Sequence, residues 1–546
     1  MHHFTASVLY IVVLFLASPW VWAASPDISS NSDRTILPGH VLSALSIAQP
    51  VTAPVMALKS TLESLTLTIV LRRSDPAGFE NYLRDVYDPQ SPQFREFLSP
   101  QEVSDRFGPS QDDYDVVQAY FEQQGFTVTE DSVNRMTLTV AGTRSTAESA
   151  LSVKINDYVI SERQFFANVN EPMLPAEIAR RVQAVSGLSS LAVPRPQIIR
   201  TIRIIFGAVI CDLEYAAIYG GLIVAASNAA NGKPLTQEQL KKIQEEAQKW
   251  LDKCVRNAVF AAYGLPIGND PPPPAWQGTD GTGQTIGLLE FDTFNPNDVS
   301  DFIHLIGLPA STFDNISQVH VNGGASPSPG PDQDEVLMDI NAVLLIAPGA
   351  KVVVYDGPFS GANVSFQALF NAMINGGVHI ISNSWSYCED QTTLADVQSI
   401  DAILQSAAAS GISVFNGSGD TGSTCLDGAP NTIGVPSDSP SATAVGGTSL
   451  TVGPGNTYIS ETWWNGTNDT PPSGQGGYGV SKFFLRPSYQ DGFNPSVMRS
   501  VPDVAANADP AHGILICKAS EGGCPTGTLN GGTSLAAPAW AALPHC

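Results

Sequence analysis

The stretch "VHIISNSWSYCEDQTTLADVQSIDAILQSAAASGISVFNGSG", Val378–Gly419, decides the fold class expected for the second half of the chain. Two apolar runs of strand length, "VHIISNSW" and "ISVFNGSG", enclose the helix-like segment "DVQSIDAILQSAAASG". The same alternation continues upstream, with strand-like "QTIGLLEF" and "KVVVYDG" and helix-like "DEVLMDINAVLLIA" and "SFQALFNAMING". This order predicts an α/β fold in which helices cover both faces of a parallel sheet. Ligand sites in such folds lie beyond the carboxyl ends of the strands.

Acidic residues are concentrated in the same half of the chain. The 546 residues carry a net charge of −25, which argues against nucleic acid as a partner. From Phe260 to Cys546 there are 25 Asp and Glu residues but only 5 Lys and Arg residues. Because bases are so few, protonating the carboxylates adds little positive charge, and we expect this domain to resist acid unfolding. Charge alone also allows a soluble acidic protein without any adaptation to acid.

Residues 1–24 are typical of a secretory signal peptide. Their apolar core begins near Val8, and Val21–Ala23 fits a small-residue cleavage site. An uncleaved membrane anchor is the alternative, although the core is short for a membrane span. We therefore expect a secreted protein, or a periplasmic one in a bacterium, without a stable membrane anchor.

Export would allow disulfides among the seven cysteines, none of which has a metal-binding spacing such as CxxC. The candidate pairs are Cys388–Cys425, Cys517–Cys524 and Cys211–Cys254.

The rest of the chain divides into four further segments. Residues 25–64 are expected to be loose, and the first part of this segment, 25–50, is polar. Residues 65–195 alternate strand-like and helix-like runs, which predicts a small α+β domain. Residues 196–258 predict a helical insert and linker, whose apolar part is interrupted by acids and is more typical of a buried segment than of a membrane span. Residues 259–546 form the predicted α/β domain.

The stretch "GGTSLAAPAW", Gly531–Trp540, places Ser534 at the start of a helix after a glycine turn. A helix N-terminus favours negative charge that develops nearby, as when a serine attacks a carbonyl. Histidine is the usual base for such a serine. Among the eight histidines, His512, which lies in a loop, is the main candidate, and its position is poor. The alternative is a serine that only caps the helix.

Carboxylates are better candidates for the base. Glu335 and Asp339 are four residues apart on a predicted helix and therefore share a face. Two neighbouring carboxylates resist ionising together, so that one can hold a proton while the other accepts one. Asp420 follows a predicted strand and, if protonated, could donate to an oxyanion. The alternatives are a solvated acidic helix face and simple turn chemistry.

Taken together, the motifs "EVLMD", "SGDTG" and "GGTSLAAP" resemble those of the sedolisins, or serine-carboxyl peptidases. The resemblance implies a subtilisin-like fold with Ser534 as nucleophile, Glu335 as its base, Asp339 orienting Glu335, and Asp420 at the oxyanion. It also implies that Glu290 and Trp385 extend the hydrogen-bond network of the acids. The segment "DPQSPQFREFLSPQEVSDRFGPS" is similar to the family's propeptide, so 65–195 is expected to be an activation domain and 259–546 the peptidase domain.

The family continues well past its nucleophile, with a last helix and a calcium loop rich in Asp and Gly. This sequence ends at Cys546, twelve residues after Ser534, so we expect a peptidase domain that is incomplete at its C-terminus. The ligands of the implied Ca²⁺ would lie beyond Cys546, and no cofactor or metal ligand is predicted within the chain.

The predicted function is a secreted, acid-acting serine-carboxyl endopeptidase made as a zymogen. Its partners would be a protein or peptide substrate and its own propeptide as an intramolecular inhibitor. Two alternatives stay open: a truncated, non-catalytic peptide-binding protein, and a neutral subtilisin-like protease that uses a histidine such as His512.

Overall fold

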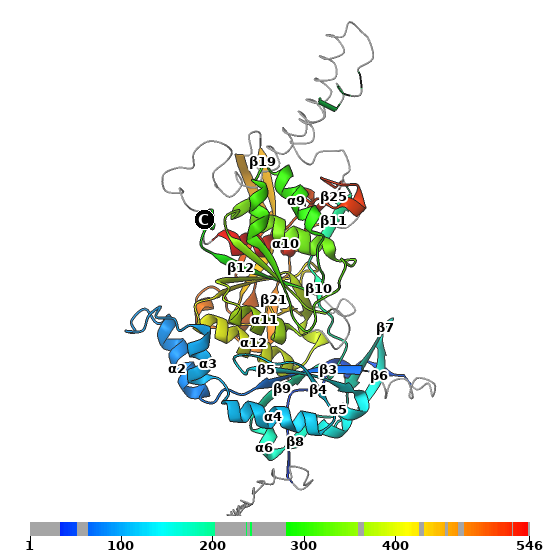
Figure 1. Cartoon of the computed structure of the whole chain (residues 1–546), viewed down its shortest axis with the longest axis vertical. Coiled ribbons are helices and arrows are strands. Elements are labelled where there is room, and N and C mark those ends of the chain that lie inside the picture. The colour runs from blue at the N-terminus through cyan, green and yellow to red at the C-terminus, as the bar shows by residue number, and fades with distance from the viewer. Residues whose placement is uncertain are drawn as a thin grey trace, which may run out of the picture.

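The computed structural model describes residues 33–51, 64–202, 236, 238, 241–242, 280–358, 365–424, 431–453, 457–467, 474–526 and 528–543 (Figure 1). The predicted signal peptide at 1–24 lies outside these residues, as does most of the predicted insert at 196–258. No helix within the described residues is long and apolar enough to cross a membrane.

An eight-stranded sheet forms the centre of the second half of the chain. Its order is β13-β14-β12-β15-β17-β19-β20, with β23 paired to β19, and every pair is parallel except β19–β20. The strands are β12 (Thr285–Glu290), β13 (Ile316–His320), β14 (Lys351–Asp356), β15 (Ile380–Asn383), β17 (Ser413–Gly417), β19 (Thr443–Gly453), β20 (Thr457–Trp463) and β23 (Val504–Asn507). The predicted parallel sheet is confirmed, and its continuous apolar strands reflect burial on both faces.

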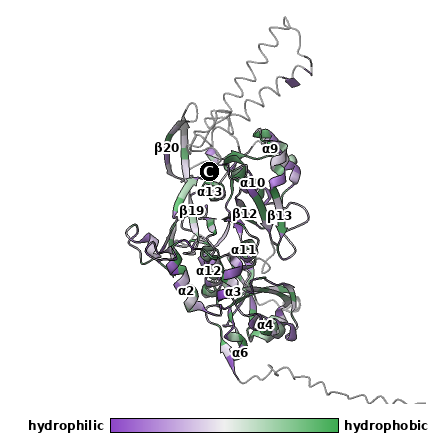
Figure 2. Cartoon of the chain, turned by 60° about the vertical axis from the view of Figure 1, so that its left-hand side comes forward, coloured by the Kyte–Doolittle hydropathy of each residue, from purple (hydrophilic) through white to green (hydrophobic). Residues whose placement is uncertain are grey.

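Helices cover both faces of this sheet, as predicted. On one face lie α9 (Pro296–Leu305), α10 (Gln333–Ile346) and α13 (Thr533–Ala542), which share one apolar core. On the other lie α11 (Phe366–Asn375) and α12 (Leu394–Ala409), which share a second core. Figure 2 shows α10 and α13 next to each other, where they pack in direct contact. Every residue of α10 is buried, because α13, α9 and the sheet surround it.

The predicted α+β domain is built on a four-stranded antiparallel sheet in the order β4-β5-β3-β9. Its strands are β3 (Ser64–Leu71), β4 (Thr127–Glu130), β5 (Thr137–Thr143) and β9 (Val182–Ser186), and its longer helices are α2 (Pro76–Tyr87), α3 (Pro100–Phe107), α4 (Gln111–Gln123) and α5 (Arg144–Leu151). A hairpin of β6 (Ile155–Ile160) and β7 (Arg163–Asn168) extends from it.

This domain packs against α11 and α12, below them in Figure 1. Val70, Met136 and Ala184 belong to the same apolar core as those two helices. Polar contacts support the packing: the Arg73 guanidinium donates to the Ala402 carbonyl at 2.8 Å. The α+β domain and the half of the chain that holds the eight-stranded sheet therefore share an interface with apolar and polar contacts.

The connection between the two parts is extended. Strand β10 (Arg195–Pro196) pairs with β16 (Trp385–Cys388), and β11 (Ile199–Ile202) pairs with β25 (Thr528–Gly531), both antiparallel. The segment predicted as a helical insert thus begins with strands. Of its later residues that the structure describes, Glu238, Lys241 and Lys242 are helical.

Cys517 and Cys524 form a disulfide, as predicted. Cys211, Cys254 and Cys425 lie outside the described residues, so the other two pairs stay predictions.

Candidate active site

Ser534 is the second residue of α13, directly after the turn that follows β25. Gly532 adopts a φ of 111°, where a side chain is strained, and a Cβ there would overlap with the Gln197 carbonyl oxygen. Gly532 is also the helix N-cap, so Ser534 is not the capping residue considered above. The Ser534 side chain is fully buried, and its hydroxyl donates to the Ser384 carbonyl oxygen at 3.3 Å.

Glu335 and Asp339 lie on α10, facing the protein interior with no exposed surface. The solvated acidic face considered above is therefore wrong. The Ser384 hydroxyl lies 2.9 Å from both oxygens of Asp339, to which it donates. Because the carbonyl of Ser384 also accepts from Ser534, this residue connects the serine to the acids.

Burial is the main cause that raises the pKa of both acids well above their usual values. For Glu335 the negative charges of Asp339 and Glu290 raise the pKa further, whereas the Ser534 hydroxyl lowers it. For Asp339 the Ser384 hydroxyl lowers the pKa. The cluster therefore holds protons, and a proton lost from one acid makes the next loss harder.

The Ser534 hydroxyl lies close enough to Glu335 to affect its pKa, yet the two are not joined by a well-formed hydrogen bond. Neither carboxyl oxygen of Glu335 has a hydrogen-bond partner of good geometry, and the hydroxyl is directed to Ser384 instead. A rotation about the Ser534 side chain would be enough to exchange one acceptor for the other.

Glu290 ends strand β12 and accepts a hydrogen bond from the indole N–H of Trp385 at 2.9 Å. Its pKa is also raised well above the usual value, by burial first and then by the charge of Asp339. Its interaction with Asp339 raises the pKa of Glu290 and lowers that of Asp339. The second carboxyl oxygen of Glu290 has no hydrogen-bond partner, so Glu290 and Asp339 affect each other through proximity and charge.

Asp420 lies in the loop after β17, at the carboxyl end of the sheet. One carboxyl oxygen accepts from the Thr533 backbone N–H at 2.8 Å and from its hydroxyl at 3.0 Å, while the other has no partner. Burial raises the pKa of Asp420 to about 8. Below that pH the unpartnered oxygen can carry a proton and act as a donor.

The geometry thus brings the predicted residues together and adds two that sequence reasoning missed. Ser384 stands directly before Trp385 in "NSWSY", and that adjacency was the available signal. Gln197, whose backbone accepts a hydrogen bond from the Ser534 N–H at 3.1 Å, has no signal in the sequence.

The candidate histidine, His512, lies beside an acid of its own loop. His512 lies on a short 3₁₀ helix at Pro510–His512, where its ring is 3.7 Å from the carboxylate of Asp509. Nowhere in the described ranges do three or more His, Cys, Asp or Glu side chains gather as they would to hold a metal ion. The implied Ca²⁺ therefore finds no candidate ligand set there.

Two family models match the chain. The model described as "Pro-kumamolisin, activation domain" matches residues 57–191, and the model of the "Subtilase family" matches residues 322–543. The first covers the α+β domain, and the second covers Glu335, Asp339, Asp420 and Ser534.

Curated relatives match over both parts. Kumamolisin of Bacillus sp. (strain MN-32) is 28% identical over 496 residues, which are 88% of this chain and 79% of the relative. Sedolisin of Pseudomonas sp. (strain 101) is 24% identical over 508 residues, covering 90% and 77%. Human tripeptidyl-peptidase 1 is 24% identical over 537 residues, covering 92% and 80%. A solved structure of Pseudomonas sedolisin, complexed with two molecules of pseudo-iodotyrostatin, aligns with a TM-score of 0.40 at 25% identity, covering 49% of this chain and 74% of that one.

Proposed function

Because the chain is a sedolisin-family serine peptidase that carries a pro-kumamolisin activation domain, we propose that it is a secreted zymogen that cleaves peptide bonds in acid through Ser534, Glu335 and Asp339. One observation carries this proposal. The buried serine of α13 lies beside the buried carboxyl groups of α10, and its hydroxyl and backbone N–H donate to Ser384 and Gln197 rather than to a histidine.

In the proposed reaction Glu335 is the base. The Ser534 hydroxyl attacks the substrate carbonyl while its proton passes to Glu335, and the same proton then goes to the leaving amine. Water hydrolyses the resulting ester by the reverse route, which regenerates Ser534. Asp339 accepts hydrogen bonds from the Ser384 hydroxyl. In this position Asp339 would orient Glu335 and adjust its pKa for its role as the base.

Two donors would stabilise the tetrahedral oxyanion. One is the backbone N–H of Ser534 at the start of α13, and the other is the protonated carboxyl of Asp420. Removing one such donor costs on the order of 10²–10³ in kcat in other serine peptidases.

The protonation states that these roles require limit activity on the alkaline side. Glu335 must be ionised while Asp420 keeps its proton, and Asp420 loses that proton at about pH 8. The first proton leaves the Glu290–Glu335–Asp339 cluster most easily, since no negative neighbour opposes it yet. The few bases of this half of the chain also limit its charge in acid.

Secretion is proposed from the signal-like residues 1–24. The substrate would be a protein or peptide, and the α+β domain would keep the enzyme inactive until it is removed.

Hydrolysis of casein across a range of pH tests the proposed base. Glu335→Gln keeps the shape of the side chain but cannot accept the proton, so activity should fall by about 10²–10⁴-fold at every pH. Asp332→Asn is the matched control, because it also replaces an acid by its amide at the start of α10, outside the cluster. Equal activity of Glu335→Gln and the wild type would refute the proposal.

A further inference from the structure

The connection after the α+β domain passes directly through the candidate active site. Arg195 pairs with Ser386 and Pro196 with Trp385, antiparallel, and the Gln197 N–H donates to the Ser384 carbonyl at 3.0 Å. These contacts hold the segment as an added strand beside β16, the mode in which extended peptides bind to a sheet edge.

The strand continues on the other side of the serine. Ile199 pairs with Gly531, and the antiparallel register runs on through Ile202 and Thr528. The Arg200 guanidinium adds an ion pair with Asp334 at 3.0 Å, next to Glu335 on α10. The chain is therefore anchored on both sides of Ser534, with residues 197 and 198 between the two anchors.

The carbonyl of Gln197 occupies the position at which a reacting carbonyl is expected. Its oxygen accepts from the Ser534 backbone N–H at 3.1 Å. A Cβ at Gly532 would overlap with this oxygen and would also lie 2.5 Å from the unpartnered oxygen of Asp420. The Gln197 oxygen therefore accepts from one of the two donors proposed for the oxyanion, and both this oxygen and the unpartnered Asp420 oxygen lie next to Gly532.

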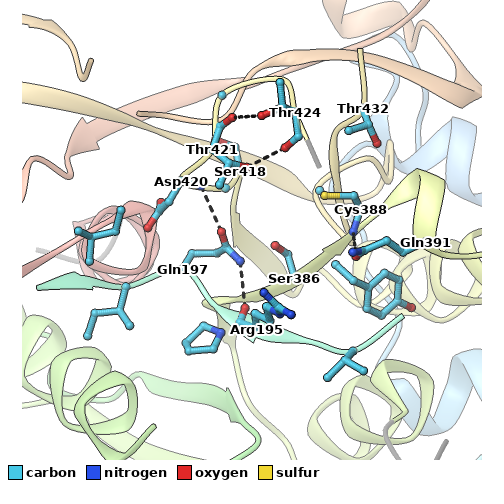
Figure 3. A pocket seen from close by; sticks show the side chains of 18 of the residues that line it. Arg195, Gln197, Ser386, Cys388, Gln391, Ser418, Asp420, Thr421, Thr424 and Thr432 are labelled. Atoms are coloured by element: carbon cyan, nitrogen blue, oxygen red, sulfur yellow. Dashed lines mark hydrogen bonds between the residues drawn. The ribbon is translucent and has the colours of Figure 1, made fainter. Parts of the chain in front are cut away.

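The side chain of Gln197 is fixed as well (Figure 3). Its amide oxygen accepts from the Asp420 backbone N–H at 3.1 Å, and its amide nitrogen donates to the Arg195 carbonyl at 3.0 Å. Gln197 and Asp420 border a cavity of about 720 Å³, which lies between the β6–β7 hairpin, the connecting strand and the loops after β16 and β17. The peptidase half thus contacts the backbone and the side chain of this one residue.

From this geometry we infer that the Gln197–Ile198 peptide bond is the first bond that the enzyme cuts, within its own chain. The inference rests on the proposed function. Ser534 Oγ bonds to the Gln197 carbonyl carbon as its proton moves to Glu335, and the bond to the Ile198 nitrogen breaks as that proton is transferred to it. Water then cleaves the ester, leaving a carboxylic acid at Gln197 and an amine at Ile198.

The position of this bond decides what the activated enzyme contains. Cutting after Gln197 separates the α+β domain from everything that follows, so the whole segment 198–258 stays attached to the peptidase half. A cut near Phe260 would instead remove that segment with the activation domain.

Sequencing of new N-termini after acid incubation of the full chain tests the inference. The wild type should yield a chain that begins Ile198-Ile199-Arg200, at a rate unchanged on dilution, and Ser534→Ala should yield none. In Ile198→Pro the nitrogen of the bond to be cut becomes part of a proline ring, so the chain that begins at residue 198 should not form. In Ile198→Val, the matched control, it should still form.

Casein hydrolysis in the same samples separates the two proposals. Hydrolysis of casein with a first N-terminus other than Ile198 overturns this inference and leaves the proposed function intact. Absence of both activities contradicts the proposed function. Hydrogen exchange in Ser534→Ala gives a readout without turnover: the Gln197 amide should be protected by Ser384, and exchange as fast as in a free peptide would also overturn the inference.

Discussion

At the scale of single residues, Asp420 has the protonation state that is simplest to test. Burial raises its pKa to about 8, and one of its oxygens has no partner. In Asp420→Asn the amide N–H donates at every pH, because it has no proton to lose in this range. We expect the decline of kcat/KM as the pH rises toward about 8 to disappear in this variant, while the acid side of the profile is unchanged. An alkaline decline identical to that of the wild type would exclude a protonated Asp420.

Ser384 is the residue that connects the acids to the serine. Its hydroxyl donates to both oxygens of Asp339, and its carbonyl accepts from the Ser534 hydroxyl. Ser384→Ala removes the hydrogen bonds of this hydroxyl to Asp339 and to the Ser534 carbonyl but keeps the backbone acceptor of Ser384. Hydrogen bonds to charged groups contribute about 1.5–3 kcal/mol. We expect kcat to fall about 10- to 100-fold with KM little changed and with the acid side of the pH profile shifted, as measured by steady-state kinetics. A change in KM alone would assign Ser384 to substrate binding instead.

At the scale of elements, strand β9 depends on a buried histidine. The Nε2 atom of His40 accepts a hydrogen bond from the Val185 N–H at 3.0 Å, and its Nδ1 lies 3.0 Å from the Leu37 carbonyl. The ring is therefore neutral, and burial lowers its pKa below the usual 6.5, although Glu171, 3.9 Å away, and Asp396 act in the opposite direction. Since the unfolded chain binds this proton more readily, the activation domain loses stability as the pH falls below about 6.5.

Urea unfolding of Ser534→Ala at pH 7 and pH 4 measures this effect. His40→Gln offers a neutral acceptor at both pH values, so the activation domain should lose less stability between pH 7 and pH 4 than it does with His40 present. Equal losses in the two proteins would show that His40 does not sense pH.

The elements also show which parts of the molecule could be predicted from sequence. Helix α10 and the turn before Ser534 are local features, and the spacing of Glu335 and Asp339 was enough to predict that they share a face. Burial of that face was not predictable, because it depends on the packing of α13 and the sheet. The contact between Gln197 and Ser534 joins residues that are far apart in the chain, and no local pattern encodes it.

At the scale of the whole molecule, the buried acids couple stability to pH. Burial raises the folded-state pKa values of Glu290, Glu335, Asp339 and Asp420 above those of the unfolded chain. The folded state therefore binds more protons, and the resulting stability is fully present below about pH 4 and is lost as the pH rises toward 8. The peptidase half should thus be most stable in acid, where the activation domain is weakened.

Calorimetry of Ser534→Ala, which cannot digest itself, checks this prediction. We expect the Tm of the peptidase half to fall between pH 4 and pH 8, and to fall less in the variant that also carries Glu335→Gln. A Tm that rises over the same interval would contradict the raised pKa values.

The central claim is that Ser534 is activated by a carboxylate. Its most direct test is the rate at which a fluorophosphonate labels Ser534 in the acid-activated enzyme, followed by mass spectrometry across pH. We expect labelling that is about 10²–10⁴-fold slower in Glu335→Gln than in the wild type at every pH, because the amide cannot accept the proton of Ser534. Labelling that disappears below about pH 6.5 and is unchanged in Glu335→Gln would contradict the claim.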